Sequence, residues 1–241
     1  NFIHVDLLPS PRYEGPMQLH GATSMDYQHN GDQWYGRQTL LAGASNWGVR
    51  ASYGHRTGED YLTGGGTRTP ASYNSRDVDL AVGVDITDTS SVEFNAIRLD
   101  QTDVEYPGQA FDMDYLVTDG YNLAYEVTDQ GLFDRLVVDV WYNRTRFTGS
   151  AQSPWKRQQF PLFFLWDYEG FTDVDTTSTG FQAAFSWGDR ESNEVTAGVD
   201  FRYVGQEVNE ISSGFKDFVF FNDVNSPIPQ SEWMNPGLFV E

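Results

Sequence analysis

Cysteine is absent from this sequence of 241 residues, so neither a disulfide framework nor a thiolate metal site can form. Long hydrophobic runs are absent too, since no stretch approaches the roughly 18 consecutive apolar residues that indicate a transmembrane helix. Basic residues are scarce: 15 Lys and Arg stand against 35 Asp and Glu, and the net charge is −20. Such a chain lacks the basic surface that binding to nucleic-acid phosphates requires.

The amino terminus carries neither a signal peptide nor an initiator methionine. Residues 1–15 hold a short apolar run and then two prolines, which predicts a short strand followed by a linker. We expect the chain to be a mature or truncated part of a longer polypeptide.

Helical periodicity is missing as well, because apolar residues at i, i+3, i+4 and i+7 are not sustained anywhere. Alternation with a period of two takes its place. In RDVDLAVGVDIT (76–87), Val78 and Val82 fall on one side of the strand, and Asp77 and Asp85 fall on the other. The pattern predicts about nine strands, at 16–30, 33–44, 47–58, 76–87, 91–102, 117–128, 134–148, 176–188 and 194–208. The phase of the second of these strands is ambiguous.

The predicted strands are unusually long, with about 12 residues where about five or six are typical. Twelve residues at about 3.3 Å each span roughly 40 Å, and a strand tilted by about 40° then rises about 30 Å, enough to cross a hydrocarbon layer. Short and long connections alternate, except at the first hairpin (30–32), as in outer-membrane barrels. The long connections are 59–75, 103–116, 149–175 and 209–241.

These features predict an all-β fold, an antiparallel transmembrane β-barrel with about nine strands in this chain. A soluble antiparallel sandwich or repeat explains the alternation equally well, and it stays the alternative. Within a barrel, the polar face of each strand would line the lumen. The charged residues that the predicted phases turn inward are Arg50, Arg56, Asp77, Asp79, Asp85, Asp139, Asp200 and Arg202. They could form a ligand path or a docking surface for a plug, or simply solvate a polar lumen.

Motifs for chemistry are few. The four histidines (His4, His20, His29 and His55) are too scattered for a metal cluster. GGGTR at 64–68 lacks the Lys-Ser/Thr and the following helix of a phosphate loop. No nucleophile motif frames any Ser, His or Asp. We therefore expect no enzyme activity, no cofactor and no resident metal.

GEDYLTGGGTRTPASYNSRDVDLAVGVDIT (58–87) resembles a long external loop and the strand after it in the TonB-dependent outer-membrane receptors. NWGVRASYGHRTGEDY (46–61) is similar to the strand before that loop. FDRLVVDVWYNRTRFTG (133–149) resembles another strand of that barrel. FIHVDLLPSPRYEG (2–15) resembles the last strand of the plug domain and its link into the barrel.

This resemblance implies a 22-stranded barrel that is filled by an N-terminal plug and imports scarce nutrients with energy from a TonB complex. Residues 1–15 would be the end of the plug and the linker, and residues 16–241 the first part of the barrel. Most of the plug and the TonB box are missing, and about nine strands cannot close so wide a barrel. We therefore expect the open edges to pair with the remainder of the barrel or with other envelope proteins. Residues 209–241 are interpreted as a long external loop and not as a terminal strand.

The implied function is uptake of a ferric siderophore or a similar scarce ligand across the outer membrane of a Gram-negative-type bacterium, in contact with lipid and lipopolysaccharide. Alternatives are a copper or cobalamin receptor of the same fold, or a structural or adhesive β protein without transport. Aromatic and basic side chains in the long loops suit flat, anionic iron chelates. The candidate ligand-binding residues are Tyr61, Arg68, Tyr73, Tyr106, Trp155, Arg157, Phe160 and Trp166. MQLHGATSMDYQH (17–29) has two Met and two His, but Met17, Met25 and His29 share one strand face whereas His20 lies on the other.

Overall fold

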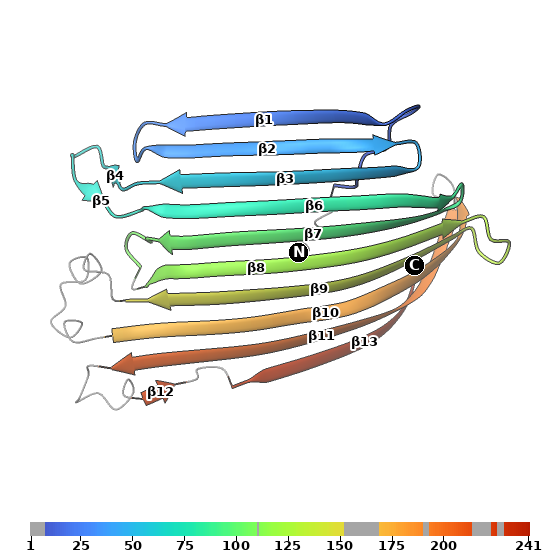
Figure 1. Ribbon diagram of the computed structural model, residues 1–241. Coiled ribbons are helices and arrows are strands. Elements are labelled where there is room, and N and C mark those ends of the chain that lie inside the picture. The colour runs from blue at the N-terminus through green and yellow to red at the C-terminus, as the bar shows by residue number, and fades with distance from the viewer. Residues whose placement is uncertain (1–7, 110, 152–168, 190–192, 214–222, 226–228) are drawn as a thin grey trace.

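The computed structural model describes residues 8–109, 111–151, 169–189, 193–213, 223–225 and 229–241. Eleven strands form one antiparallel sheet in the order β1-β2-β3-β6-β7-β8-β9-β10-β11-β12, and β13 also pairs with β11 (Figure 1). The sheet strands are β1 (Gln18–Gln28), β2 (Gln33–Ala44), β3 (Trp47–Gly58), β6 (Tyr73–Thr87), β7 (Ser90–Val104), β8 (Asp112–Thr128), β9 (Arg135–Ser150), β10 (Glu169–Asp189), β11 (Asn193–Ser213), β12 (Asp223–Asn225) and β13 (Ser231–Val240). β4 (Tyr61–Leu62) and β5 (Arg68–Thr69) form a separate small hairpin.

All nine predicted strands are present, and the sheet joins them in chain order, so each strand pairs with its sequence neighbour. Several strands are longer than predicted: β10 and β11 have 21 residues each. Short turns lie at one end of the sheet. At the other end, the first hairpin is tight, and Gly31 and Asp32 take positive φ angles of 89° and 41° there. The segment between β3 and β6, with the hairpin of β4 and β5, lies at this second end, which we call the long-loop end (Figure 1).

The interpretation of residues 209–241 as a loop without a terminal strand is wrong. β11 continues to Ser213, and β13 pairs with β11 from Gln206↔Ser231 to Ala197↔Val240. The loop 59–75 also contains the β4–β5 hairpin, and β8 begins inside the predicted loop 103–116. The short strand predicted within residues 1–15 falls mainly on residues 1–7, which lie outside the described residues.

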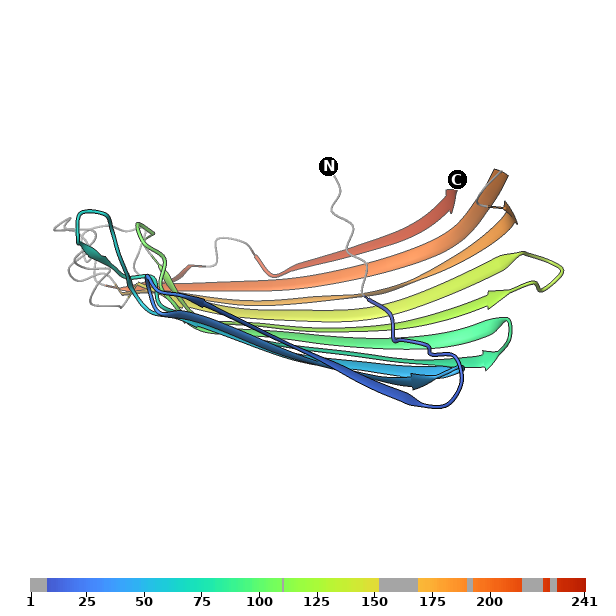
Figure 2. The same cartoon turned by 90° about the horizontal axis from the view of Figure 1, so that it is seen from above.

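The two faces of the sheet differ as the alternation predicts. The sheet is curved, and residues 8–16 lie against its concave side (Figure 2). The convex face carries Val78, Leu123, Val140, Phe181 and Val199, all of them well exposed. Towards the sheet edges the exposure of apolar side chains is larger still, at 73% for Met25 and 86% for Leu238. The buried hydrophobic residues within the described part of the chain are only Ala81, Met113, Val127, Ala151 and Val208.

The sheet is open, because among the described residues β1 pairs with β2 alone and makes no ladder with β11 or β13. The convex apolar face is therefore not covered by a second protein layer within the described residues. No helix in the described residues is long and apolar enough to cross a membrane.

Candidate functional site

The concave face holds most of the charge of the sheet. Cross-strand partners share a face, and the register can be followed from strand to strand. Asp77 on β6 is the cross-strand partner of Gly54 on β3. In a separate row, Ala124, Asp139, Gln182 and Asp200 are successive cross-strand partners on β8, β9, β10 and β11. All eight residues that were expected to face inward lie on this concave face, namely Arg50, Arg56, Asp77, Asp79, Asp85, Asp139, Asp200 and Arg202.

A network of ion pairs crosses β2, β3 and β6 on this face. Arg37 contacts both Asp77, at 2.5 Å, and Asp79. Arg50 lies 3.2 Å from Asp79, and the side chains of Arg50 and Asp79 are only 14% and 15% exposed. Arg37 reaches Asp77 across Gly54, where a Cβ atom would overlap the Asp77 carboxylate. The glycine therefore allows an ion pair between strands that are not neighbours.

A clamp holds the residues that precede β1 against the short-turn end of the concave face. Arg12 binds Asp85 through two hydrogen bonds, Nε–Oδ2 at 3.1 Å and Nη2–Oδ1 at 2.9 Å. Ser10 donates to Glu93 from its backbone amide, at 2.5 Å, and from its hydroxyl, at 2.8 Å. The Tyr13 amide donates to the Ala44 carbonyl at 3.2 Å. Charge-assisted, bidentate contacts of this kind are the stronger class of hydrogen bond.

Two glycines on neighbouring strands make room for this clamp. A Cβ atom on Gly48 would overlap the Pro11 carbonyl oxygen, and one on Gly83 would overlap Glu93 and Ser10. Gly48 and Gly83 are cross-strand partners on β3 and β6. Because a backbone oxygen cannot rotate aside, the close approach at Gly48 requires glycine. We call residues 8–13 the strap.

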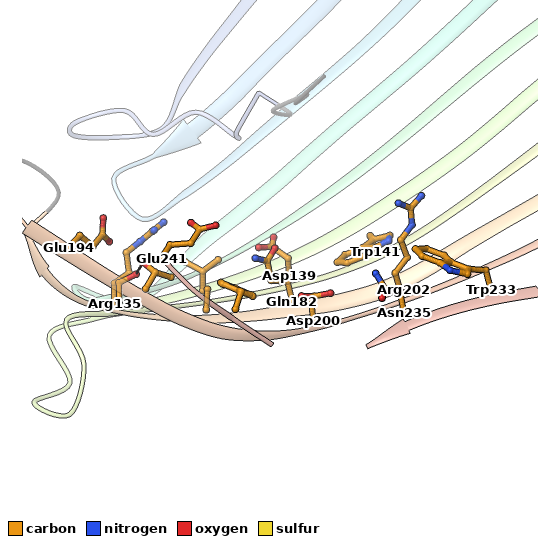
Figure 3. A pocket seen from close by; sticks show the side chains of 15 residues that line it. Arg135, Asp139, Trp141, Gln182, Glu194, Asp200, Arg202, Trp233, Asn235 and Glu241 are labelled. Atoms are coloured by element: carbon orange, nitrogen blue, oxygen red, sulfur yellow. Dashed lines mark hydrogen bonds between the residues drawn. The ribbon is translucent and has the colours of Figure 1, made fainter. Parts of the chain in front are cut away.

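A groove of about 740 Å³ runs along the concave face of β9, β10, β11 and β13 (Figure 3). The Arg202 guanidinium lies 5.8 Å from the centre of the Trp233 ring, within the distance of a cation–π contact. Trp141 occupies the space over Gly180, where a Cβ atom would overlap its ring. Acidic groups also line the groove, among them Asp139, Asp200, Glu194 and Glu241. The groove therefore offers positive, negative and hydrogen-bonding side chains to a ligand.

A smaller hollow of about 310 Å³ lies on the concave face at the long-loop end. Arg56 stacks over the Tyr35 ring at 4.8 Å from its centre, and Asp26 lies opposite Tyr35 on β1. Gln28, Gln33 and Tyr73 also line this mouth hollow. An exposed guanidinium beside aromatic and amide groups suits an anionic or planar ligand.

The four described loop residues that were expected to bind ligand do not gather in one place. Tyr73 lines the mouth hollow, whereas Arg68 is bound to Asp60 at 2.8 Å on the small hairpin that also carries Tyr61. Tyr106 is exposed in the β7–β8 loop. The other four, Trp155, Arg157, Phe160 and Trp166, lie outside the described residues.

The sequence analysis missed several aromatic residues of the concave face, among them Trp141, Tyr35 and Trp233. Trp141 shares the phase of Asp139 on β9, so the alternation alone could have placed it there. Tyr35 was hidden by the ambiguous phase of 33–44, and Trp233 by the interpretation of its segment as a loop. The Met and His residues of β1 do not converge: Met25 lies on the convex face, and His20 contacts Gln18 at 3.1 Å on the other. The described residues contain no group of three or more His, Cys, Asp or Glu that could hold a metal ion.

No family model matches the sequence, and no curated protein matches it. Among solved structures, the chain is similar to one described as copper transporter OprC, with a TM-score of 0.74 and 17% sequence identity. The match covers 95% of this chain and 35% of that chain, so this chain spans about a third of the length of its structural neighbour. The likeness shows the fold alone: the open, antiparallel β-sheet of this chain has the same arrangement as about a third of that structure.

The need for glycine at position 48, beneath the strap, can be tested by substitution. We expect Gly48→Ala to displace the strap, and the amides of Ser10 and Tyr13 to exchange with solvent roughly tenfold faster, because the substitution lowers the free energy needed to open the strap. Hydrogen exchange followed by mass spectrometry measures this. Gly36→Ala is the matched control, since a Cβ atom there meets nothing within 4 Å. Equal protection of the strap amides from exchange in both variants would show that the strap does not need glycine at position 48.

Proposed function

We propose that this chain is part of the barrel of an outer-membrane, TonB-dependent receptor that imports a ferric siderophore or a similar scarce ligand. The observation that carries the proposal is the division of one curved sheet into an exposed apolar face and a charged face crossed by the strap. A soluble sheet would bury its apolar face against a second layer. Large exposed apolar patches otherwise mark a contact with protein or membrane, and lipid is the environment that suits this face.

The height of the apolar band supports a membrane setting. On β11 the apolar residues of the convex face run from Val195 to Tyr203. This is about 26 Å along the strand and about 20 Å along the membrane normal at a tilt of about 40°. Outer-membrane barrels have a band of about 25 Å, which is slightly taller.

A polar collar borders this band at the long-loop end of the convex face. Arg98 and Arg146 both contact Asp119, at 2.8 and 2.9 Å, and Arg144 contacts Asp175 at 2.5 Å. Paired charges are costly in hydrocarbon but stable in the head-group region or in water. The collar therefore fits the level where a barrel leaves the lipid, and it is where contact with lipopolysaccharide is proposed.

The strap supports a filled barrel. It enters the concave side at the short-turn end and is fixed there by Asp85 and Glu93. This is the path expected of a linker that joins a plug to its barrel. In the proposal, residues 1–15 end such a plug, and TonB acts through the plug. The open edges of β1 and β13 pair with the remainder of the barrel or with other envelope proteins.

The mouth hollow supports an anionic chelate as ligand, because Arg56 and Tyr35 offer a cation and an aromatic face. Copper is the second candidate, since the structural neighbour is described as a copper transporter. Cobalamin uptake, or a structural or adhesive role without transport, remain the further alternatives.

Adjacent valines on β9 test the membrane setting. Val138 lies on the convex face, whereas Val137 lines the concave groove. We expect Val138→Arg to destabilise the assembled protein by about 2–4 kcal/mol, because it places a charge in lipid. Val137→Arg should have a much smaller effect. Fractionation and heat-modifiable gel mobility of the full-length protein measure assembly. Recovery of the unmutated protein in the detergent-free soluble fraction, or equal effects of both variants, would contradict the proposal.

Uptake assays test the ligand. Cells that carry the full-length gene should accumulate iron from at least one of a set of ferric catecholate and hydroxamate chelates, and a TonB deletion should abolish this uptake. Arg56→Ala should weaken uptake by roughly tenfold, the loss expected for one charged contact. His55→Ala is the neighbouring control, because His55 lies on the opposite face and contacts Asn74. TonB-dependent uptake of Cu²⁺ but of no iron chelate would instead support the copper alternative.

A further inference from the structure

The strap is fastened to four strands on the concave side of the sheet (Figure 2). At its start, the Leu8 carbonyl accepts a hydrogen bond from Arg50 on β3. At its end, the Tyr13 amide donates to the Ala44 carbonyl on β2 at 3.2 Å. Between these two points, side chains of the strap bind carboxylates on β6 and β7. Six consecutive residues are therefore attached across β2, β3, β6 and β7.

The side-chain contacts of the strap form one continuous network of Ser10, Arg12, Asp85 and Glu93, which we call the strap network. Arg12 binds Asp85 through two hydrogen bonds, and Arg12 Nη1 donates to the Ser10 hydroxyl at 2.7 Å. That hydroxyl donates in turn to Glu93 at 2.8 Å. Ser10 is only 6% exposed. Linked hydrogen bonds to charged groups strengthen one another where water is largely excluded. Displacement of Ser10 therefore breaks contacts on both sides of it at once.

Three glycines on adjacent strands form the floor beneath the strap. Gly43, Gly48 and Gly83 are successive cross-strand partners on β2, β3 and β6. A Cβ atom on Gly43 would lie 3.0 Å from the Pro11 carbonyl oxygen, and Cβ atoms on the other two would overlap the strap. The next partner in this row is Glu93 on β7, whose carboxylate reaches over Gly83. The strap therefore lies directly on the backbone of the sheet, with a carboxylate at one end of the row.

β1, which follows the strap, has fewer attachments. Within the described residues it pairs with β2 alone. Its ladder begins at Gln18, so a pull on that end would separate the cross-strand pairs one after another. Tyr13 contacts His20 of β1, with ring centres 4.8 Å apart. A displacement of the chain that passed the strap network would therefore reach β1 directly.

The residues between the strap and β1 provide a contrast within the same chain. Residues 14–17 are exposed, and a Cβ atom on Gly15 would meet nothing within 4 Å. A connection that only joins two parts of a chain needs length and no more. Paired charges, a buried serine and a glycine floor add nothing to such a connection, so the strap has the contacts of an anchor.

We propose that the strap is a mechanical stop, which ends any displacement of the chain before residue 8 and keeps it from reaching β1. The stop is the strap network, which comes before the contact of Tyr13 with His20 in the chain. In the proposed transport function the preceding chain is a plug, and the stop would let that plug move while the sheet stays paired. The inference does not require transport, because it concerns only where a displacement along the chain ends.

Single-molecule pulling measures the stop directly. Leu8 and Leu132 are 68% and 85% exposed, and the chain has no native cysteine. Handles at Leu8→Cys and Leu132→Cys, in the purified full-length protein free of other cysteines, let optical tweezers pull the strap against the β8–β9 turn. We expect a separate first rupture that releases residues 9–17, at most about 30 Å. Only then should β1 extend, whose 11 residues add up to about 40 Å.

Two substitutions within the strap remove the network without altering the sheet. A hydrogen bond to a charged group contributes about a factor of ten or more. Ser10→Ala and Arg12→Ala should therefore each shorten the lifetime of the attached strap under constant force by roughly tenfold or more. Glu126→Gln is the matched control, because its ion pair with Arg135, at 2.5 Å, joins β8 to β9 on the same face. It should leave the lifetime unchanged.

The order of the two ruptures decides the outcome. Extension of β1 before residues 9–17, or together with them, would overturn the stop. A lifetime that either strap variant leaves unchanged would overturn it as well. Unchanged circular dichroism shows that each variant keeps its sheet. Because the handles load the strap itself, a negative result would leave the proposed transport function open, and a failure of transport would leave the stop standing.

Discussion

The fold depends on one constraint: every backbone N–H and C=O in the strands must find a partner inside the sheet. In lipid an unpaired group costs several kcal/mol, so a spanning segment satisfies its backbone through continuous ladders. The neighbouring strands β9, β10 and β11 follow this rule, with unbroken pairing over their whole facing lengths. Once the ladders fix the backbone, side chains alternate between faces, except where the register shifts after Asp85 and after Met113. This alternation lets a single layer present an apolar surface on one side and a charged one on the other.

Glycine residues allow close approaches on the concave face, and the structure of that face depends on them. A flat sheet limits an ion pair to adjacent strands, and the missing side chain of Gly54 lets Arg37 reach across β3 to Asp77. Gly48 and Gly83 similarly bring the backbone of the strap into contact with the sheet. Where glycine is present, the charged face gains long-range contacts that alternation alone would not supply. Arg37 and Arg50 are therefore paired with the acids of β6 in one network that spans three strands.

The sequence predicted the strand faces, which depend on the period of two within one strand. It missed the contacts that depend on how distant segments pair in the folded chain. The faces of β6 and β11 followed from alternating apolar residues, because a period of two has only two phases. Strand 33–44 was ambiguous, since Trp34 and Leu40 on one face compete with Tyr35 and Leu41 on the other. The ion pair of Arg12 and Asp85 joins residues that are far apart in sequence. No local pattern indicates such a pair, because it depends on how the strap crosses the folded sheet.

The error at β13 has a physical cause that also bears on the edge of the sheet. Pro236 and Gly237 interrupt the segment, and both residues normally argue against a strand. Thr196 and Glu241 exchange both backbone hydrogen bonds with each other. Hydrogen-bonded pairs alternate along an antiparallel ladder, so the pair Phe201↔Pro236 is one whose amides point away from each other. Proline therefore costs the β11–β13 ladder nothing, and its missing donor lies on the outer edge of β13. Any strand that completes the sheet there has to pass Pro236 without one hydrogen bond, which a bulge or a local shift of register would provide.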